Sequence, residues 1–257
     1  MTVSPAFVEL AHRLADAAGP IIKRYFRSGA AIVDKDDLSP VTVADRESEA
    51  AMRAIIAEAQ PTHGVLGEEM GADRADAEYV WVLDPIDGTK SFVTGKPLFG
   101  TLISLTHRGI PVIGIIDQPV LGERWLGIAG QGSTFNGQPI KTRACATLTD
   151  AWLYTTTPYL FSGTNKVSFE RLAESVKFPL FGCDCYAYGM LAAGWTDLVC
   201  EVSLKPYDWC ALVPVIEEAG GIITDWEGHK LTIASGGRVL AAGDARMHAE
   251  AMVRLTG

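Results

Sequence analysis

The chain has 257 residues, of which 48% are hydrophobic and 21% are charged, and its formal net charge is −9. This length and composition are typical of one large globular domain or of two closely packed ones. The negative charge argues against nucleic acid or an anionic membrane surface as a partner. It would also repel a phosphorylated substrate, unless metal ions reverse the sign of the local charge.

The first segment, residues 4–28, is predicted to form an amphipathic helix. Apolar side chains recur in it near helical spacing from Phe7 to Tyr25, and Gly29 follows as a helix end. Charges occur throughout this segment, which is not typical of a signal peptide. Elsewhere no apolar run approaches the ~20 residues that a bilayer-spanning helix requires, so we expect no membrane association.

The cysteines favour a reducing compartment. There are five of them, an odd number, and most lie in apolar sequence contexts. This usage is typical of reduced, buried thiols and predicts a cytoplasmic protein. Cys183 and Cys185 form a lone C-x-C pair without a second Cys or His pair nearby, so a zinc site is disfavoured.

The hydrophobic pattern changes along the chain. A second helix is expected between Thr42 and Pro61, and it is followed by apolar segments (TLISL, PVIGIIDQPV, ERWLGIAG) that indicate an antiparallel meander. Later segments alternate between strand and helix patterns. We therefore predict an α+β fold with an N-terminal half at 1–145, which holds the antiparallel sheet, and a C-terminal α/β half at 146–257.

The segment WVLDPIDGTKSF places two aspartates at the end of a hydrophobic strand. Pro85 favours an extended conformation for Asp84, whereas Asp87 and Gly88 are expected to turn the chain, so both carboxylates can converge just past the strand end. Gly88 would also let a ligand approach nearby backbone amides closely. For either aspartate by itself, a turn or cap residue is the favoured interpretation.

Carboxylates follow the same pattern at three further places. Glu68 and Glu69 end the strand segment HGVLG, Asp208 begins a helix in WCALVPVIEEAGG, and Asp45 lies in the first turn of the second helix. Singly, these are typical of a solvated edge, an N-cap and a favourable helix dipole contact. Gathered together, they would repel one another unless a hard divalent cation neutralised them, and an all-oxygen ligand set suits Mg²⁺.

Three motifs resemble the inositol monophosphatase superfamily: Gly67-Glu68-Glu69, the segment DPIDGT at 84–89, and Asp208 with Gly220-Gly221 downstream. The resemblance covers nearly the whole chain. The usual Trp-Asp pair before the last long helix is Tyr207-Asp208 in this chain, which keeps the carboxylate. The resemblance implies a layered α/β/α/β/α sandwich, Mg²⁺-dependent hydrolysis of phosphate monoesters and a homodimer.

The resemblance also implies a metal site with two or three Mg²⁺ ions. A first ion would be held by Glu68, Asp84 and the carbonyl oxygen of Ile86. A second ion would be held by Asp84, Asp87 and Asp208, and Glu68 would help to place a looser third ion. Most of these ligands belong to the N-terminal half.

Further positions take their implied functions from the same resemblance. Glu69 would act through water, and the backbone amides of Gly88 and Thr89 would bind the phosphate group. The Thr89 hydroxyl, hydrogen-bonded to Asp45, would orient the attacking water, so these two side chains join Glu68 and Asp87 as the expected catalytic group. Lys35 resembles a mobile lysine that approaches the site, although a solvated surface lysine is an equally good interpretation.

Substrate choice is expected to depend on the second half. Residues 178–201 contain no Lys or Arg but include Asp184 and Glu201, so a cationic substrate suits this segment better than a bisphosphate, which would require basic residues. The segment GCDCYAYG at 182–189 resembles histidinol-phosphate phosphatases of the inositol monophosphatase type. TTTP at 155–158, LKPYD at 204–208 and GTL at 100–102 support the same branch.

That branch implies contacts for three acidic residues. Asp184 would contact the histidinol amine, Glu201 would bind the amine or imidazole end, and Asp208 would border the substrate as well as the metal. A helix N-cap is the alternative for Asp184. Tyr186 and Tyr188 are expected to be core residues, because aromatic side chains two apart commonly are.

These features predict a phosphatase that converts L-histidinol phosphate to L-histidinol in histidine biosynthesis. The alternative is the same chemistry on inositol 1-phosphate or on a broad range of polyol and sugar monophosphates. A third hypothesis is a non-catalytic, metal-binding protein with this fold. It is disfavoured because every expected ligand is present, with Thr89 and Asp45 beside them.

Overall fold

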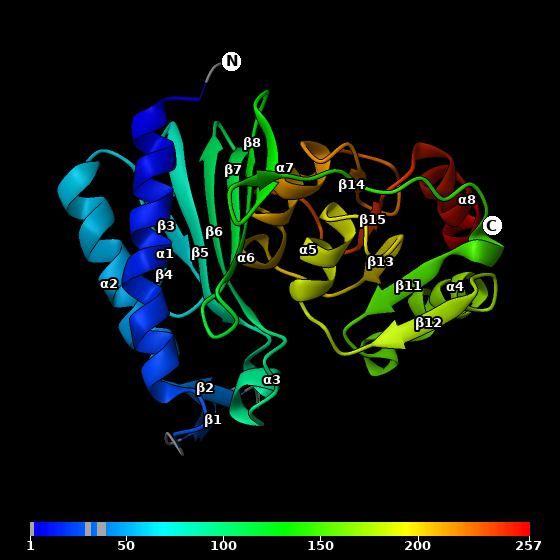
Figure 1. Ribbon diagram of the computed structural model, residues 1–257, viewed down its shortest axis with the longest axis horizontal. Coiled ribbons are helices and arrows are strands. Elements are labelled where there is room, and N and C mark those ends of the chain that lie inside the picture. The colour runs from blue at the N-terminus through cyan, green and yellow to red at the C-terminus, as the bar shows by residue number, and fades with distance from the viewer. Residues whose placement is uncertain (1–2, 29–31, 35–39) are drawn as a thin grey trace.

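A computed structural model describes residues 3–28, 32–34 and 40–257. The helices alternate with two sheets to give the layered α/β/α/β/α arrangement that the sequence predicted (Figure 1). The α-helices are α1 (Pro5–Tyr25), α2 (Val43–Ala59), α3 (Thr89–Val93), α4 (Gly163–Ala173), α5 (Tyr186–Ala192), α6 (Pro206–Trp209), α7 (Leu212–Glu217) and α8 (Ala245–Thr256). Two short 3-10 helices are η1 (Leu148–Asp150) and η2 (Pro158–Leu160).

The larger sheet has eight strands in the order β10-β9-β8-β7-β6-β5-β3-β4. Its neighbours pair antiparallel except β3 and β5, which are parallel, so the predicted antiparallel meander is confirmed. The strands are β3 (Gly64–Gly67), β4 (Gly71–Asp73), β5 (Tyr79–Asp87), β6 (Gly100–His107), β7 (Ile110–Gln118), β8 (Glu123–Ile128), β9 (Gly132–Phe135) and β10 (Gln138–Pro139). A separate antiparallel pair is formed by β1 (Ile32–Asp34) and β2 (Pro40–Thr42).

The smaller sheet has five strands in the order β12-β11-β13-β15-β14. Here β11 pairs parallel with both β12 and β13, whereas β15 pairs antiparallel with β13 and β14. The strands are β11 (Trp152–Thr155), β12 (Phe178–Phe181), β13 (Leu198–Glu201), β14 (Ile222–Thr224) and β15 (Val239–Ala242). This mixed sheet agrees with the alternating pattern of the C-terminal part of the sequence.

Helices α1 and α2 cover the outer face of the larger sheet. The apolar stripe of α1, including Leu14 and Ile22, packs with Trp81 and Ile103 of the sheet in one buried cluster. This face explains the predicted amphipathic helix. The helix ends at Tyr25, three residues before the predicted end.

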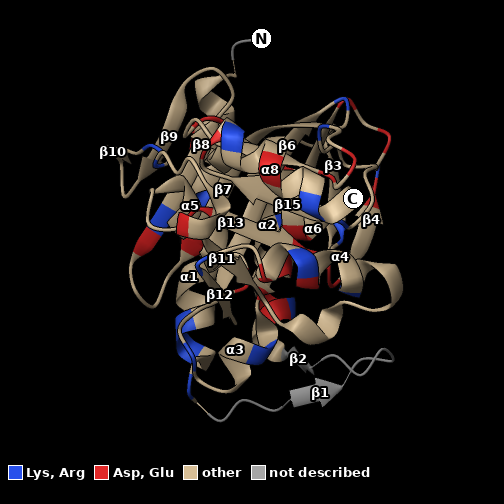
Figure 2. Cartoon of the chain, turned by 90° about the vertical axis from the view of Figure 1, so that its right-hand side faces the viewer, with Lys and Arg blue, Asp and Glu red and all other residues tan. Residues whose placement is uncertain are grey.

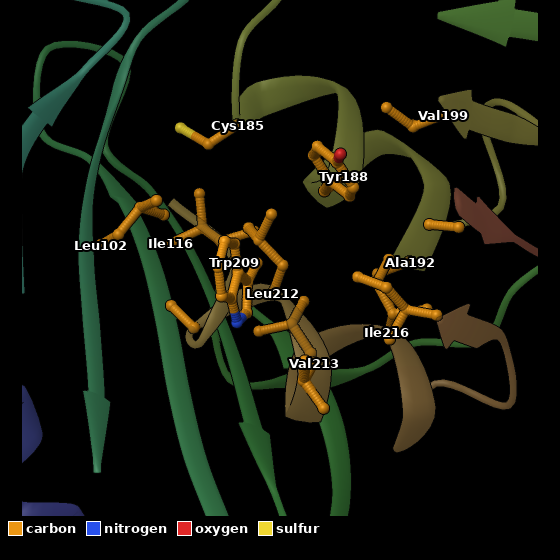
Figure 3. Packing of buried hydrophobic residues seen from close by; sticks show 14 of the residues in the cluster. Leu102, Ile116, Cys185, Tyr188, Ala192, Val199, Trp209, Leu212, Val213 and Ile216 are labelled. Atoms are coloured by element: carbon orange, nitrogen blue, oxygen red, sulfur yellow. The ribbon is translucent and has the colours of Figure 1, made fainter. Parts of the chain in front are cut away.

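Helices α5, α6 and α7 fill the space between the two sheets (Figure 3). Trp209 and Leu212 pack there against Leu102 and Ile116 of the larger sheet, while Val199 belongs to the smaller sheet. Tyr188 is 1% exposed in this same core. The central layer therefore brings α6, which carries the predicted metal ligand Asp208, against β5 and β6 of the larger sheet, and Asp184 directly precedes α5 in the same layer.

The predicted helix from Asp208 onward was wrong in its boundaries. The segment forms two short helices, α6 and α7, and α6 starts before Asp208, at Pro206. Proline suits the first position of a helix because its missing N–H would be unpaired there. Asp208 is thus not the N-cap. It lies in the first turn of α6, where its Oδ2 accepts a hydrogen bond of 2.6 Å from the Lys205 amide.

Candidate active site

A bulge in β5 brings the two aspartates of the DPIDGT segment to the same side. Asp84 lies opposite Leu102 in β6, whereas Asp87 lies opposite Gly100, so three steps along β5 match two along β6. In a regular strand, residues three apart point to opposite faces, but one extra residue restores the alignment. We expected the strand to end at Asp84. This boundary was wrong, because the strand continues through the bulge to Asp87.

Thr101 stabilises this bulge. Its buried hydroxyl donates a 2.8 Å hydrogen bond to the carbonyl oxygen of Pro85. The Asp84 Oδ1 accepts a hydrogen bond of 3.1 Å from the Ile86 amide. Since Pro85 has no N–H to offer to β6, these two contacts replace part of the interrupted strand pairing.

Three carboxylates converge at this point. Asp84, Asp87 and Asp208 each offer one oxygen, and these oxygens lie within 4.8 Å of one another. Asp208 reaches the other two from α6, which packs against β5 and β6. The structure therefore brings together the two strand aspartates and the distant helix aspartate, as the sequence predicted.

Glu68 and Glu69 occupy the turn after β3, the strand that pairs parallel with β5. The Glu68 amide donates a 3.1 Å hydrogen bond to the carbonyl oxygen of Leu83, the residue before Asp84. Glu69 is not a solvated edge residue: its side chain is 3% exposed and lies 3.8 Å from the Arg46 guanidinium. The turn is thus attached to the strand that carries the aspartates.

Gly88 and Thr89 continue directly from β5 into α3. Gly88 has φ 85°, a left-handed conformation that favours glycine, and it is the N-cap of this short helix. The Thr89 hydroxyl donates a 3.1 Å hydrogen bond to the carbonyl oxygen of Ile86. The predicted bond from Thr89 to Asp45 is therefore not the one that this hydroxyl makes. Asp45 is 1% exposed in the first turn of α2, and Lys35 lies outside the described residues.

Burial and mutual repulsion dominate the electrostatics of the cluster. Burial raises the pKa of Asp84 well above its usual range, and the negative charges of Glu68 and Asp87 raise it further. The pKa of Asp87 is likewise raised, by burial and then by Asp184 and Asp208. Burial also raises the pKa of Asp208 to about 7, against the opposing hydrogen bond from the Lys205 amide.

This donor set fits a hard divalent cation. The grouped ligand atoms are carboxylate oxygens, and in the sequence of β5 Ile86, with its carbonyl oxygen, comes between Asp84 and Asp87. The site therefore requires no nitrogen or sulfur donor. Carboxylates that raise one another's pKa are stabilised in their charged form by a cation placed among them. Oxygen ligands of this kind are the ones that Mg²⁺ prefers.

Asp184 lies beside Gly88 and has φ 47°, a left-handed conformation. Its Oδ2 accepts a 3.1 Å hydrogen bond from the Ser91 hydroxyl, and a Cβ on Gly88 would lie 3.1 Å from its side chain. Cys185, not Asp184, is the N-cap of α5. Burial raises the pKa of Asp184, while the hydrogen bond from Ser91 and the charges of Lys96 and Lys90 oppose this. Figure 2 shows basic residues in blue on and beside α3.

Glu201, the last residue of β13, is 3% exposed. Its Oε1 accepts a 2.8 Å hydrogen bond from the Thr156 amide, and its Oε2 accepts one of 3.2 Å from the Tyr188 hydroxyl. Burial raises its pKa, and the hydrogen bonds from Thr156 oppose the rise. Tyr188 is therefore both a core residue and a contact of this carboxylate.

A small pocket of about 120 Å³ lies between the aspartate cluster, represented by Asp87 and Asp208, and the acidic residues Asp184 and Glu201. It is lined by Asp87, Thr156, Leu160, Asp184, Cys185, Tyr188, Glu201, Leu204, Asp208 and Leu212. Four of these are acidic and none is basic. A larger pocket of about 510 Å³ lies elsewhere, between α1 and the β7–β9 strands, and contains none of the predicted site residues.

The sequence did not reveal the residues that hold the carboxylates in place. Ser91, Thr101 and Thr156 each donate a hydrogen bond that orients the site, and the Cys185 amide donates one of 2.6 Å to Asp87. The segments GTL and TTTP contain two of these residues and were noted only as part of the resemblance. Their function depends on contacts between distant segments, which no local pattern indicates.

The comparisons with known proteins agree with this geometry. The model of the inositol monophosphatase family matches residues 6–256. The chain is 52% identical to the chloroplastic bifunctional phosphatase IMPL2 of Arabidopsis thaliana, across 97% of this chain and 75% of that protein. It is 33% identical to a histidinol-phosphatase of Chlorobaculum parvum, across 91% of each. The solved structure of an inositol monophosphatase from Zymomonas mobilis is 48% identical, covers 96% of each chain and superposes with a TM-score of 0.90.

Proposed function

This chain belongs to the inositol monophosphatase family, and we propose that it hydrolyses L-histidinol phosphate to L-histidinol and phosphate with Mg²⁺ as its metal. As a member of this family, it is a metal-dependent phosphomonoesterase. The identity of the phosphate ester is the part that we infer. The observation that carries this inference is the pocket beside the aspartate cluster, whose charged lining is entirely acidic.

The pocket chemistry favours a substrate with a cation at one end and a phosphate at the other. Glu201 is a buried carboxylate and Asp184 a partly buried one, and their described hydrogen bonds come from neutral donors, Thr156, Tyr188 and Ser91. A buried carboxylate gains most from a positively charged partner. Histidinol phosphate provides an ammonium group and an imidazole at the end opposite to the phosphate.

The aspartate cluster suits the phosphate end. We propose that Glu68, Asp84 and the Ile86 carbonyl hold one Mg²⁺, that Asp84, Asp87 and Asp208 hold a second, and that Glu68 helps to place a third. When bound, Mg²⁺ supplies positive charge that offsets the carboxylates and polarises the phosphate group. The positive charge of the ions would explain how a chain with a net charge of −9 accepts an anionic ester.

The loop after β5 is suited to bind the phosphate oxygens. The first amides of a helix have no acceptor within the helix, so those of Gly88 and Thr89 at the start of α3 can donate to the phosphate. The Thr89 hydroxyl gives its hydrogen to Ile86, and its oxygen retains lone pairs that can accept a hydrogen bond from the attacking water. We propose that Asp45 assists this orientation and that Glu69 acts through water.

Inositol 1-phosphate is the second candidate substrate. It is favoured by the 48% identity and the TM-score of 0.90 to the Zymomonas mobilis inositol monophosphatase. The same aspartate cluster would serve either ester, because both present a phosphate monoester to the metal. Only the pocket wall distinguishes them, since a neutral polyol gains no charge pairing with Glu201.

Phosphate release from L-histidinol phosphate and from inositol 1-phosphate, measured in parallel with Mg²⁺ and with EDTA, tests the proposal. We expect kcat/KM to favour histidinol phosphate by at least about tenfold, the effect of one charge-assisted contact, and EDTA to abolish both reactions. Preference for the inositol ester would keep the metal site and overturn the substrate. Undiminished release in EDTA would overturn the metal site.

Two further properties stay predictions. No helix among the described residues is long and apolar enough to cross a membrane. A cytoplasmic location and a homodimer are still expected from the cysteine usage and from the family resemblance. Fractionation of cells and sedimentation of the purified protein are the measurements that check them.

A further inference from the structure

Helix α2 carries a buried carboxylate that was not predicted to belong to the site. The Glu49 side chain is 0% exposed. Its Oε2 accepts a 2.8 Å hydrogen bond from the Glu69 amide, and its Oε1 accepts bonds from the Met70 amide at 3.1 Å and from Arg53 Nε at 2.7 Å. Two oxygens thus bind three donors, two of them backbone amides of the turn that contains Glu68.

Gly67 makes room for this carboxylate. A Cβ at position 67 would lie 2.1 Å from Glu49 Oε1 and 2.7 Å from Oε2. Any other residue would therefore displace the Glu49 side chain or the turn. The first residue of the Gly67-Glu68-Glu69 motif is a glycine because the carboxylate occupies the space beside it.

Arg53, one helical turn after Glu49, completes the contact. Its guanidinium pairs with Glu49 and also donates a hydrogen bond to the carbonyl oxygen of Gly71, at the start of β4. The positive charge compensates the buried negative charge of Glu49. Helix α2 thus binds the amides on one side of the turn and a carbonyl on the other.

The opposite end of the turn is attached to β5, the strand that carries Asp84 and Asp87. The Glu68 amide donates to the Leu83 carbonyl oxygen, next to Asp84 in β5. Glu68 therefore lies between two anchors, β5 before it and Glu49 after it. Without the second anchor, the turn would lose its contact with α2 and keep the hydrogen bond to β5 and the pairing of the short β3–β4 hairpin.

We propose that Glu49 is a positioning residue, which aims the Glu68 carboxylate at the Mg²⁺ site without binding the metal itself. The inference rests on the metal site of the proposed function. Residues that orient metal ligands typically contribute about 10- to 100-fold to metal affinity. A purely structural function of Glu49 would instead affect folding stability equally with and without metal.

The test is Mg²⁺ titration of the purified full chain by calorimetry, together with the melting temperature in Mg²⁺ and in EDTA. Glu49→Gln keeps the size of the side chain but replaces one carboxylate oxygen by an NH₂ group. This NH₂ group cannot accept a hydrogen bond, so it faces an N–H donor of the turn or of Arg53. We expect the Kd for Mg²⁺ to rise about 10- to 100-fold and the Mg²⁺-induced increase in melting temperature to shrink accordingly. Glu58→Gln, at an exposed position on the same helix, should change neither quantity.

Arg53→Met provides a second variant at a less buried position, where the side chain is 17% exposed. It should raise the Kd in the same direction by a smaller factor. Wild-type Mg²⁺ affinity in a folded Glu49→Gln or Arg53→Met protein would overturn the proposal. Asp87→Asn separates this failure from failure of the metal site, because undiminished Mg²⁺ binding in Asp87→Asn would overturn the proposed function instead.

A double-mutant cycle tests the match between Glu49 and Gly67. Gly67→Ala alone should weaken Mg²⁺ binding, because its methyl group displaces the carboxylate. In a Glu49→Ala background the same methyl group has space, so it should add little further loss. Fully additive losses would show that the two positions act independently and would overturn the proposed contact.

Discussion

The two groups of carboxylates in the active site are stabilised in different ways. Asp84 and Asp87 lie on a strand bulge, and the pKa of each is raised, by burial first and then by neighbouring carboxylates. Glu201, on the smaller sheet, is equally buried, but both its oxygens accept hydrogen bonds, from Thr156 and Tyr188. We therefore expect the first group to bind a cation in the substrate-free protein, whereas the hydrogen bonds to Glu201 offset part of the cost of its burial before a cationic substrate binds.

This difference indicates which residues would bind the phosphate group and which would recognise the rest of the substrate. On the proposed function, the aspartate cluster binds the phosphate end, which all phosphate monoesters share, through its metal. The wall that contains Glu201 and Asp184 belongs to the later part of the chain and lines the pocket. Variants of the two groups should therefore fail in different ways.

Asp87→Asn should cause the largest loss. The substitution removes one negative charge from the cluster while it keeps the acceptor for the Cys185 amide, so the fold should persist. We expect kcat/KM to fall at least about 10³-fold for every phosphate ester, near the upper end for the loss of one electrostatic contact. Steady-state kinetics with an exposed-site control, Asp76→Asn, provide the check; near-normal turnover would remove Asp87 from the metal site.

Glu201→Gln should affect one substrate selectively. Glutamine can still accept from the Thr156 amide, and its NH₂ group can donate to the Tyr188 oxygen, so only the charge is lost. We expect kcat/KM to fall about 10- to 100-fold for L-histidinol phosphate and little for glycerol 2-phosphate. Equal losses on both esters would show that Glu201 does not bind the cationic end. Asp184→Ala should show the same selectivity through KM.

The affinity for Mg²⁺ should depend on pH. Burial raises the pKa of Asp208 to about 7, so below this pH the metal-free carboxyl holds a proton that Mg²⁺ must displace. The Kd should therefore rise as the pH falls below about 7, by about tenfold per pH unit for each proton that Mg²⁺ displaces. Calorimetric titrations from about pH 6 to about pH 8 measure this, and an unchanged Kd would contradict a metal at Asp208.

Thr101→Val should produce the smallest effect. It removes the hydroxyl that donates to the Pro85 carbonyl at the bulge, which should cost about 1–3 kcal/mol in the free energy of unfolding and weaken Mg²⁺ binding a few-fold. Thr106→Val is the matched control on the same strand, because its hydroxyl donates to the Val80 carbonyl of β5 away from the site. Urea unfolding and Mg²⁺ titration of both variants distinguish the two effects; equal Mg²⁺ affinities would show that the bulge does not depend on Thr101.

The sequence by itself determined the fold class and the chemistry of the metal site. Amphipathic periodicity predicted α1 and the meander, since burial of one face of an element leaves a repeating pattern in the chain. The motifs GEE and DPIDGT placed acidic residues after apolar strands, and Asp208 before an apolar helix. These are local properties, which neighbouring residues encode together.

Only the tertiary structure decided how those acidic residues act together. The bulge that aligns Asp84 with Asp87 depends on the pairing with β6, and Asp208 joins them because α6 packs against β5. The helix boundaries near Asp208 and the acceptor of the Thr89 hydroxyl likewise depend on the three-dimensional surroundings of these residues. The contact between Glu49 and Gly67 joins α2 to a turn eighteen positions later, and a single sequence carries no periodic trace of such pairs because they are matched in space rather than along the chain.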